Sequence, residues 1–217
     1  MGTQDDRLRE ALAAMDPSRR LRAALDAGTR PRPEDAAVLV ERCAREPDFF
    51  VRDMLTWALT RHPASRTVPL LVAELASPVP QARSQALHTL SKIGDASAWP
   101  HLTETLLRDR DMDVARAAWR AAVALVPAGR EDWLADVLVS QLGRGDTEMQ
   151  KSLSRALLVL DTAAGTALAR ALESPRAAVR AHAQATLRLR DDPDAGFAGA
   201  LEEAKRVVAL GRQGAGG

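Results

Sequence analysis

The segment TVPLLVAELASPVPQARSQALHTLSKIG, residues 67–94, has the pattern of two amphipathic helices joined by a short turn. Its first half carries apolar residues at the spacing of one helix face: Val68, Leu71, Val72 and Leu75. Its second half does the same with smaller side chains: Ala82, Ala86, Thr89, Leu90 and Ile93. Ser77-Pro78 is predicted to cap and start the second helix, because Ser satisfies free amides and Pro lacks an N–H there. Asp16-Pro17 and Ser174-Pro175 predict helix starts of the same kind. Gly94 is predicted to end it.

The same unit recurs along the chain at intervals of about 30 residues, which is the signature of a helical repeat. Its anchor is a basic residue, usually after an apolar one: Arg22, Arg52, Arg83, Arg116, Lys151 and Arg180. Because these residues recur with the repeat, we interpret them as structural. The pattern predicts six helix pairs over residues 7–28, 34–62, 65–94, 97–126, 130–160 and 163–190. Strand signals are absent from the sequence, so we expect an all-α protein.

A last helix is predicted over residues 195–210 as a cap for the terminal repeat, whose outer face has no neighbour. Its apolar face consists of Phe197, Leu201, Ala204 and Val208. The Gly-rich residues 211–217 are predicted to be disordered. We therefore expect one repeat domain over residues 1–210.

The repeat resembles the HEAT family, including the HEAT-like repeats of the phycobilin-lyase type. Pro69 and Pro100 occupy the place of that family's first-helix proline, and the Val-Arg type doublets occupy its second-helix position. The resemblance implies a right-handed α-solenoid with an armadillo-like fold. Many family members also carry Asp six residues before the Arg, forming a polar ladder between repeats. Here that column contains Asp16, Glu46, Ser77, Arg110, Gly145 and Ser174, so a continuous ladder is not predicted past the second repeat.

Charge and cysteine content narrow the classes of function. Thirty basic and 29 acidic residues nearly balance, so bulk charge gives little support to a nucleic-acid or membrane partner. The chain has a single cysteine, and its first residues lack the apolar run of a signal peptide. No apolar stretch is long enough to span a membrane. We expect a cytoplasmic protein, and its preference for Arg over Lys suggests a GC-rich, bacterial genome.

In repeats of this type the second helices usually line the concave face. Counting from the anchor, positions +4, +5 and +8 are predicted to face that groove, which would contain an aromatic start and a row of arginines: Trp57, His88, Arg120, Arg155 and Arg188. We predict that these five side chains bind a protein or peptide partner with apolar and acidic character. The alternative is a solvated arginine face and, if the register slips by one residue, a Trp57 that belongs to the core.

The sequence contains no phosphate-binding glycine loop, and its His and Cys residues do not have the spacing of metal ligands. The histidines are dispersed: His62, His88, His101 and His182. Cys43 lies on an apolar helix face and is predicted to be buried. Acidic pairs lie at helix starts, where they stabilise the helix dipole. The sequence therefore predicts a non-enzymatic scaffold without a metal or a cofactor.

Two other functions rest on looser resemblances. Some bacterial alkylpurine DNA glycosylases are built from HEAT-like repeats and carry an Asp four residues after a groove Trp. Here Arg61 follows Trp57 at that distance, and Asp53 precedes it, so the order is reversed. The chain also resembles the HEAT-like region of some actinobacterial MerR-type transcription regulators, which would make it an accessory to such a regulator.

Overall fold

The computed structural model describes residues 4–192 and 196–211, and these residues form helices without any strand. Contacts within the chain divide it into two compact units, unit 1 over residues 1–125 and unit 2 over residues 126–217. In the described residues, consecutive helices form six pairs and one last helix, which confirms the predicted all-α solenoid of helix pairs. The right-handed twist and the single domain over residues 1–210 stay predictions.

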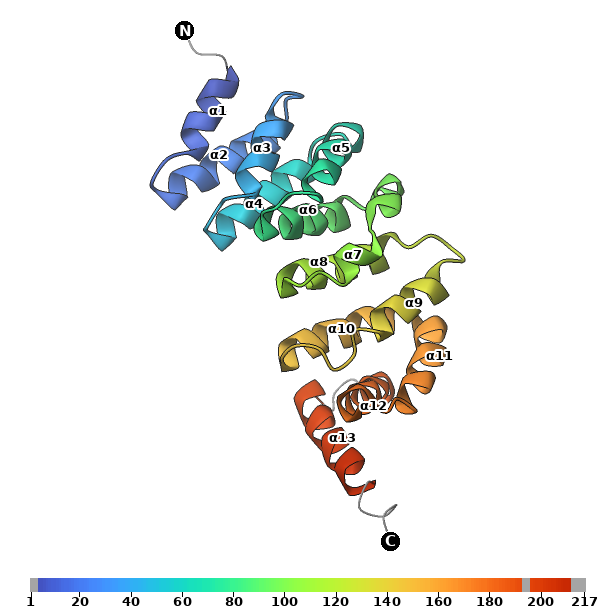
Figure 1. The fold of residues 1–217 in the computed structure, drawn as a ribbon. Coiled ribbons are helices and arrows are strands. Elements are labelled where there is room, and N and C mark those ends of the chain that lie inside the picture. Colours follow the sequence, from blue (N-terminus) through green and yellow to red (C-terminus); the bar gives the residue numbers. More distant parts are fainter. Residues whose placement is uncertain (1–3, 193–195, 212–217) are drawn as a thin grey trace. The chain divides into compact units, whose positions relative to one another are not determined.

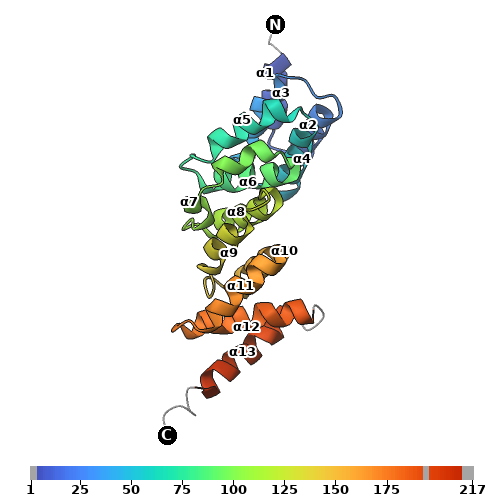
Figure 2. The same cartoon turned by 90° about the vertical axis from the view of Figure 1, so that its right-hand side faces the viewer.

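Unit 1 consists of two layers of helices. The first helices of the pairs form one layer: α1 (Gln4–Leu12), α3 (Asp35–Cys43), α5 (Ala64–Glu74) and the short elements η1 (Ala96–His101) and α7 (Glu104–Leu107). The second helices form the other layer: α2 (Pro17–Thr29), α4 (Phe49–Thr60), α6 (Pro80–Ile93) and α8 (Met112–Leu125). Each second helix packs on the next, so α4, α6 and α8 lie side by side (Figures 1 and 2).

Unit 2 contains α9 (Glu131–Val139), α10 (Thr147–Val159), α11 (Asp161–Leu172), α12 (Ala177–Asp191) and α13 (Phe197–Gly211). Helix α9 packs on α11, α10 on α12, and α13 covers α12. The predicted cap is confirmed, since Phe197, Leu201 and Ala204 are buried against Ala181 and Ala185 of α12. Residue 195 and residues 212–217, which include most of the predicted tail, lie outside the described residues.

Two of the three Ser-Pro or Asp-Pro helix starts differ from the prediction. Pro17 does begin α2, and Asp16 caps it by accepting a hydrogen bond from the Ser18 amide at 2.9 Å. Ser77, in contrast, accepts from the Val79 amide at 3.3 Å, closing a turn two residues ahead, and α6 begins at Pro80. Ser174 forms the same turn, so α12 begins at Ala177. A Ser hydroxyl can close either a turn or a helix cap, and the sequence does not distinguish the two.

The first helix of the fourth pair is broken where a continuous helix was predicted. Pro100 lies in η1, and Thr103 caps the separate helix α7 by accepting from the Leu106 amide. Trp119 of α8 is 1% exposed and packs against this break. Its indole N–H donates to the Leu107 carbonyl at 2.8 Å, which satisfies the one polar atom of a buried Trp.

The anchor residue of the first repeat is Arg20 and not Arg22. The Arg20 guanidinium donates to the Ala14 and Met15 carbonyls, six and five residues before it. Arg52, Arg83 and Arg180 make the equivalent bonds to the turn before their own helices, whereas Arg22 is exposed. Because this contact recurs, it supports the structural interpretation of these arginines.

Part of a polar ladder also exists beyond the second repeat. Arg20 forms a bidentate ion pair with the buried Glu46 of the next repeat, at 2.8 and 2.9 Å. Arg83 pairs in the same way with Asp109, at 3.1 and 3.2 Å. The second pair is a single rung beyond the second repeat, where a continuous ladder was not expected. Asp109, the acid of the fourth repeat, lies one position before Arg110, which occupies the expected column.

Candidate functional site: a groove on the second helices of unit 1

The second helices of unit 1 carry one outward-facing column of side chains. It consists of Leu25 on α2, Trp57 on α4, His88 on α6 and Arg120 on α8. Leu25 and Trp57 are 42% and 38% exposed, His88 is half-buried and Arg120 is exposed. Three of the five predicted site residues therefore share one face of unit 1.

The predicted register of this face needs a correction. Thr56 and Leu87, in the +4 column that was expected to face the groove, are buried. In α8 the +4 residue Arg120 is exposed and the +5 residue Ala121 is buried. Ala115 is thus the positional equivalent of Arg52 in this helix. A shift of one residue rotates a helix face by about 100°, which decides whether a column is core or surface.

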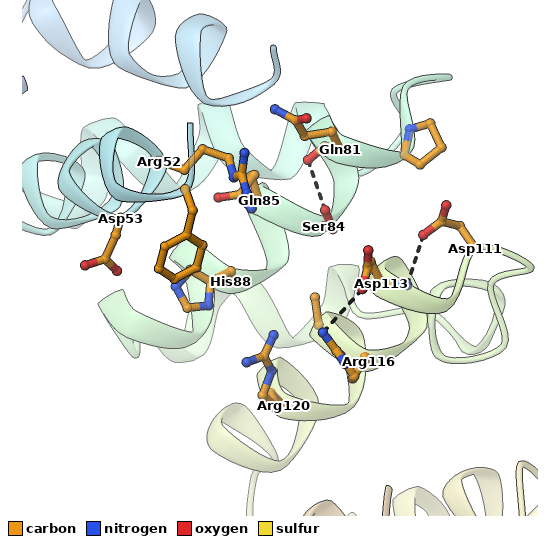
Figure 3. A pocket seen from close by; sticks show the side chains of 13 residues that line it. Arg52, Asp53, Gln81, Ser84, Gln85, His88, Asp111, Asp113, Arg116 and Arg120 are labelled. Carbon is orange, nitrogen blue, oxygen red and sulfur yellow. Dashed lines mark hydrogen bonds and ion pairs between the residues drawn. The ribbon is translucent and has the colours of Figure 1, made fainter. Parts of the chain in front are cut away.

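A groove of about 560 Å³ lies on this face, between α4, α6 and α8. It is lined at helical spacing by polar and charged side chains with a few apolar ones, including Phe49, Asp53, Gln85, His88, Arg116 and Arg120. Figure 3 shows that Asp53, His88 and Arg120 come from three successive second helices. The groove is therefore a product of the repeat: the same helix face is presented three times.

Two of the charged side chains that line the groove, Arg120 and Asp53, have no ion-pair partner among the described residues. Arg116 forms an ion pair with Asp113 at 3.3 Å (Figure 3). In the described part of the chain, no carboxylate lies within ion-pairing distance of the Arg120 guanidinium. Partial burial lowers the pKa of Arg120, and the nearby Arg116 lowers it further against the opposing effect of Asp113. The exposed guanidinium of Arg120 therefore has no counter-ion in the described part of the chain.

The imidazole of His88 lies in the same electrostatic environment. Its pKa is lowered from the usual 6.5, mainly by burial and then by the positive charges of Arg120 and Lys92, while Asp53 opposes the shift. His88 is therefore neutral at pH 7 and can donate or accept one hydrogen bond to a ligand.

Two exposed aromatic residues at the start of α4 were missed by the sequence analysis. Phe49 and Phe50 are 65% and 71% exposed, with ring centroids 5.6 Å apart in an edge-to-face arrangement. The Arg52 guanidinium carbon lies 5.9 Å from the centroid of the Phe49 ring, at cation–π distance. Phe49 lines the groove. The sequence contains one signal for this exposed pair: two adjacent aromatic residues lie at the start of a helix, before its first buried residue, Val51.

Trp57 is neither a solvated side chain nor a core residue. Its ring packs on Gly28 of α2, where an added Cβ would lie 2.3 Å from the ring atom Cζ3. Gly28 therefore makes room for an indole that stays on the outward face. Trp57 follows Asp53 by one helical turn on α4, but it does not line the groove itself.

The two remaining predicted site residues belong to unit 2. Arg155 is exposed on α10 and Arg188 is half-buried on α12. In α10, Gln150 donates to the Gly145 carbonyl at 3.1 Å, as Arg52 does to Pro47, so Gln150 replaces Lys151 as the anchor. Arg155 then occupies the same repeat position as His88 and Arg120. The groove of unit 1 is formed without either residue.

Other reactive groups of the described residues are buried or isolated. Cys43 is 3% exposed, as predicted, and burial raises the pKa of its thiol to about 12. His62 is 6% exposed, and neither ring nitrogen has a hydrogen-bond partner among the described residues. Three or more metal-ligating side chains do not come together anywhere in that part of the chain. None of its helices has the length and apolar character that a membrane span needs.

The groove lies in a part of the chain that matches a known family. Residues 36–124, from α3 to α8, match the family described as HEAT repeats. These residues are HEAT repeats. The match confirms the resemblance that the Pro and Val-Arg positions indicated, and it includes every residue that lines the groove.

Two solved structures match most of this chain's length. The complex of CpcE and CpcF of phycocyanin lyase from Nostoc sp. PCC7120 is 19% identical, with a TM-score of 0.50, covering 98% of this chain and 89% of that chain. An engineered protein is 19% identical, with a TM-score of 0.45, covering 90% of this chain and all of the other. At this identity the likeness to the lyase complex concerns the fold. No curated protein matches the sequence significantly.

Proposed function

We propose that this HEAT-repeat chain is a non-enzymatic scaffold that binds a protein or peptide partner in the groove on α4, α6 and α8. One observation carries the proposal: the groove places the unpaired Arg120 and the exposed ring of Phe49 on one uncovered face. Aromatic and Arg side chains dominate the binding energy of protein interfaces. An exposed aromatic ring and an exposed guanidinium in one concavity, lined otherwise by polar side chains, support binding of a partner there.

The charge balance of the groove favours a protein over a nucleic acid. Its arginines are matched by an equal number of aspartates: Arg52, Arg116 and Arg120 against Asp53, Asp111 and Asp113. A nucleic-acid site needs several cations that each neutralise a phosphate, and carboxylates beside them oppose this. The fold neighbour from phycocyanin lyase is a complex of two proteins, which agrees with a protein partner for this fold.

The experiment compares capture of partners by the immobilised full chain and by two variants that reverse one Arg charge each. Arg120→Glu changes the groove. Arg66→Glu is the matched control, because Arg66 is exposed on α5 in the other layer of the same unit. Lysate of the source cells is treated with nuclease and the bound proteins are quantified by mass spectrometry.

We expect a protein that binds wild type and Arg66→Glu and is lost with Arg120→Glu, while circular dichroism shows the variant to be folded. Capture that survives in Arg120→Glu would place the partner on another face. Capture that vanishes after nuclease treatment in every sample would indicate nucleic acid, as in the glycosylase and regulator alternatives, and the proposed function would be wrong.

We propose Arg155 and Arg188 of unit 2 as a second contact for the same partner. Arg155 shares the repeat position of Arg120 and is exposed, which supports this extension. The double variant Arg155→Glu/Arg188→Glu, tested in the same capture experiment, is expected to weaken retention. Unchanged retention would limit the interface to unit 1.

A further inference from the structure

The pairing of charges in the groove indicates the chemistry of its partner. Asp113 pairs with Arg116, and Arg52 donates to the Glu46 and Pro47 carbonyls and lies over Phe49. Arg120 alone among the groove arginines has no such partner in the described residues, and its exposed guanidinium lies near the like charge of Arg116, which disfavours it. One negative group on the partner would relieve this cost, and a planar carboxylate fits the guanidinium in a bidentate geometry.

We propose that the groove recognises a single side-chain carboxylate of its partner at Arg120, together with an adjacent apolar side chain that packs on Phe49. This inference rests on the proposed function and names the class of segment that the groove selects. The partner is a peptide segment, internal to its chain, in which one Asp or Glu lies close to a Leu, Met, Phe or similar residue.

The carboxylates that line the groove limit the partner to one negative charge. Asp53 lies on the α4 side, and Asp111 and Asp113 lie at the start of α8. A second acid in the segment, or a run of phosphates, would face one of these carboxylates, and like charges repel. Nucleic acids and strongly acidic peptides are therefore rejected.

Phe49 is the proposed contact for the apolar side chain of the partner. Its ring is 65% exposed, yet its position is restrained by Phe50 at one edge and by the Arg52 guanidinium over its face. A restrained aromatic side chain loses little conformational entropy when it is covered, which makes it an efficient anchor. An apolar partner residue that packs on this ring removes apolar surface of both side chains from water.

The test uses random peptides of twelve residues displayed on phage, joined at their C-terminus to the coat protein so that no peptide has a free C-terminal carboxylate. Selections are run against the full chain as wild type, Arg120→Glu and Arg66→Glu. With wild type and Arg66→Glu we expect one Asp or Glu near an apolar residue to be enriched. With Arg120→Glu we expect Lys or Arg to be enriched at that position instead.

An enriched wild-type peptide is then titrated by calorimetry. Arg120→Gln and the replacement of the peptide acid by its amide are each expected to weaken binding about tenfold, and the two changes together no further, because they remove the same pair. Phe49→Ala is expected to weaken binding by a similar factor, whereas Arg66→Gln leaves it unchanged. A single-stranded DNA probe of twenty nucleotides is expected not to bind.

The outcomes separate this inference from the proposed function. Peptides that are enriched by wild type without a common acid, or an identical selection by Arg120→Glu, would overturn the carboxylate inference and leave a peptide-binding scaffold. Enrichment only from a library with free C-termini would move the recognised group to the chain end and also overturn it. Tight binding of the DNA probe, with no peptide enriched, would overturn both the inference and the proposed function.

Discussion

The buried His182 of unit 2 makes the stability of that unit depend on pH. Its ring is 0% exposed and packs edge-on against Phe197, with centroids 5.7 Å apart. The Gly143 amide donates to Nδ1 at 3.0 Å, so the ring proton is on Nε2, which lies 3.0 Å from the Gln150 carbonyl and from the Ser154 hydroxyl. Burial lowers the pKa of His182 to about 4, against a weaker opposing effect of the Gln150 carbonyl. A protonated ring would place an N–H against the Gly143 N–H.

The sign and size of the effect follow from this difference in pKa. In the unfolded chain His182 has the usual pKa of 6.5, whereas in the folded chain its pKa is about 4. Stability is therefore complete above pH 6.5 and is lost as the pH falls toward 4. The full loss is roughly 3 kcal/mol, at about 1.4 kcal/mol per pKa unit, and roughly 2 kcal/mol of it has occurred by pH 5.

The measurement is hydrogen–deuterium exchange of the full chain, resolved to peptides by mass spectrometry and corrected for the intrinsic exchange rate at pH 7.5 and pH 5. His182→Gln removes the titrating group, so the comparison of wild type with this variant isolates its contribution from that of other acids and histidines. Opening of α10 and α12 in wild type should become about thirtyfold more frequent at pH 5, relative to the change in the variant. Peptides of α8 in unit 1 serve as the internal reference.

The predicted effect of His182 is refuted if the opening free energies of wild type and His182→Gln differ by the same amount at both pH values. It is also refuted if the variant loses more stability on acidification than wild type. Either result would mean that His182 titrates at an ordinary pKa in the folded chain and that its environment is more hydrated than the structure shows.

Three further outcomes test the packing of unit 1. Arg20→Met removes the bidentate partner of the buried Glu46 carboxylate and leaves Arg42 as its remaining ion pair, so urea unfolding should show a loss of about 2 kcal/mol. A loss of under about 1 kcal/mol would contradict the pairing. Gly28→Ala forces a Cβ into the Trp57 ring, so we expect about 1–3 kcal/mol of destabilisation and a shifted tryptophan emission, and an unchanged spectrum would refute the contact. Cys43, whose thiol pKa is raised to about 12 by burial, should react with a disulfide reagent only as fast as the chain unfolds, and immediate labelling of the native protein would show it to be accessible.

The sequence predicted part of the outward column because its signal was periodic. Trp57, His88 and Arg120 were identified from their repeat positions, and the structure places all three in one outward column. The exposure of Phe49 and Phe50 was not predicted, because two aromatic residues at a helix start are as compatible with a core as with a surface. Their exposure depends on which neighbouring helix covers the first turn of α4.

Local chemistry determined the helices themselves. Apolar residues at helical spacing, together with Pro17 and Gly94 as helix boundaries, sufficed to predict six helix pairs and a cap, because helix formation and termination depend on residues within one or two turns. The resemblance to HEAT repeats followed from the same local positions.

Only the tertiary structure decided the rotation of each helix and the partner of each charge. Arg20 rather than Arg22 enters the core, and Arg83 finds its acid at Asp109, one position outside the expected column. A helix turns by about 100° per residue, so a shift of one position in the repeat exchanges a buried column for an exposed one. That choice is made by the packing of neighbouring repeats, and it is what leaves Arg120 unpaired on the groove.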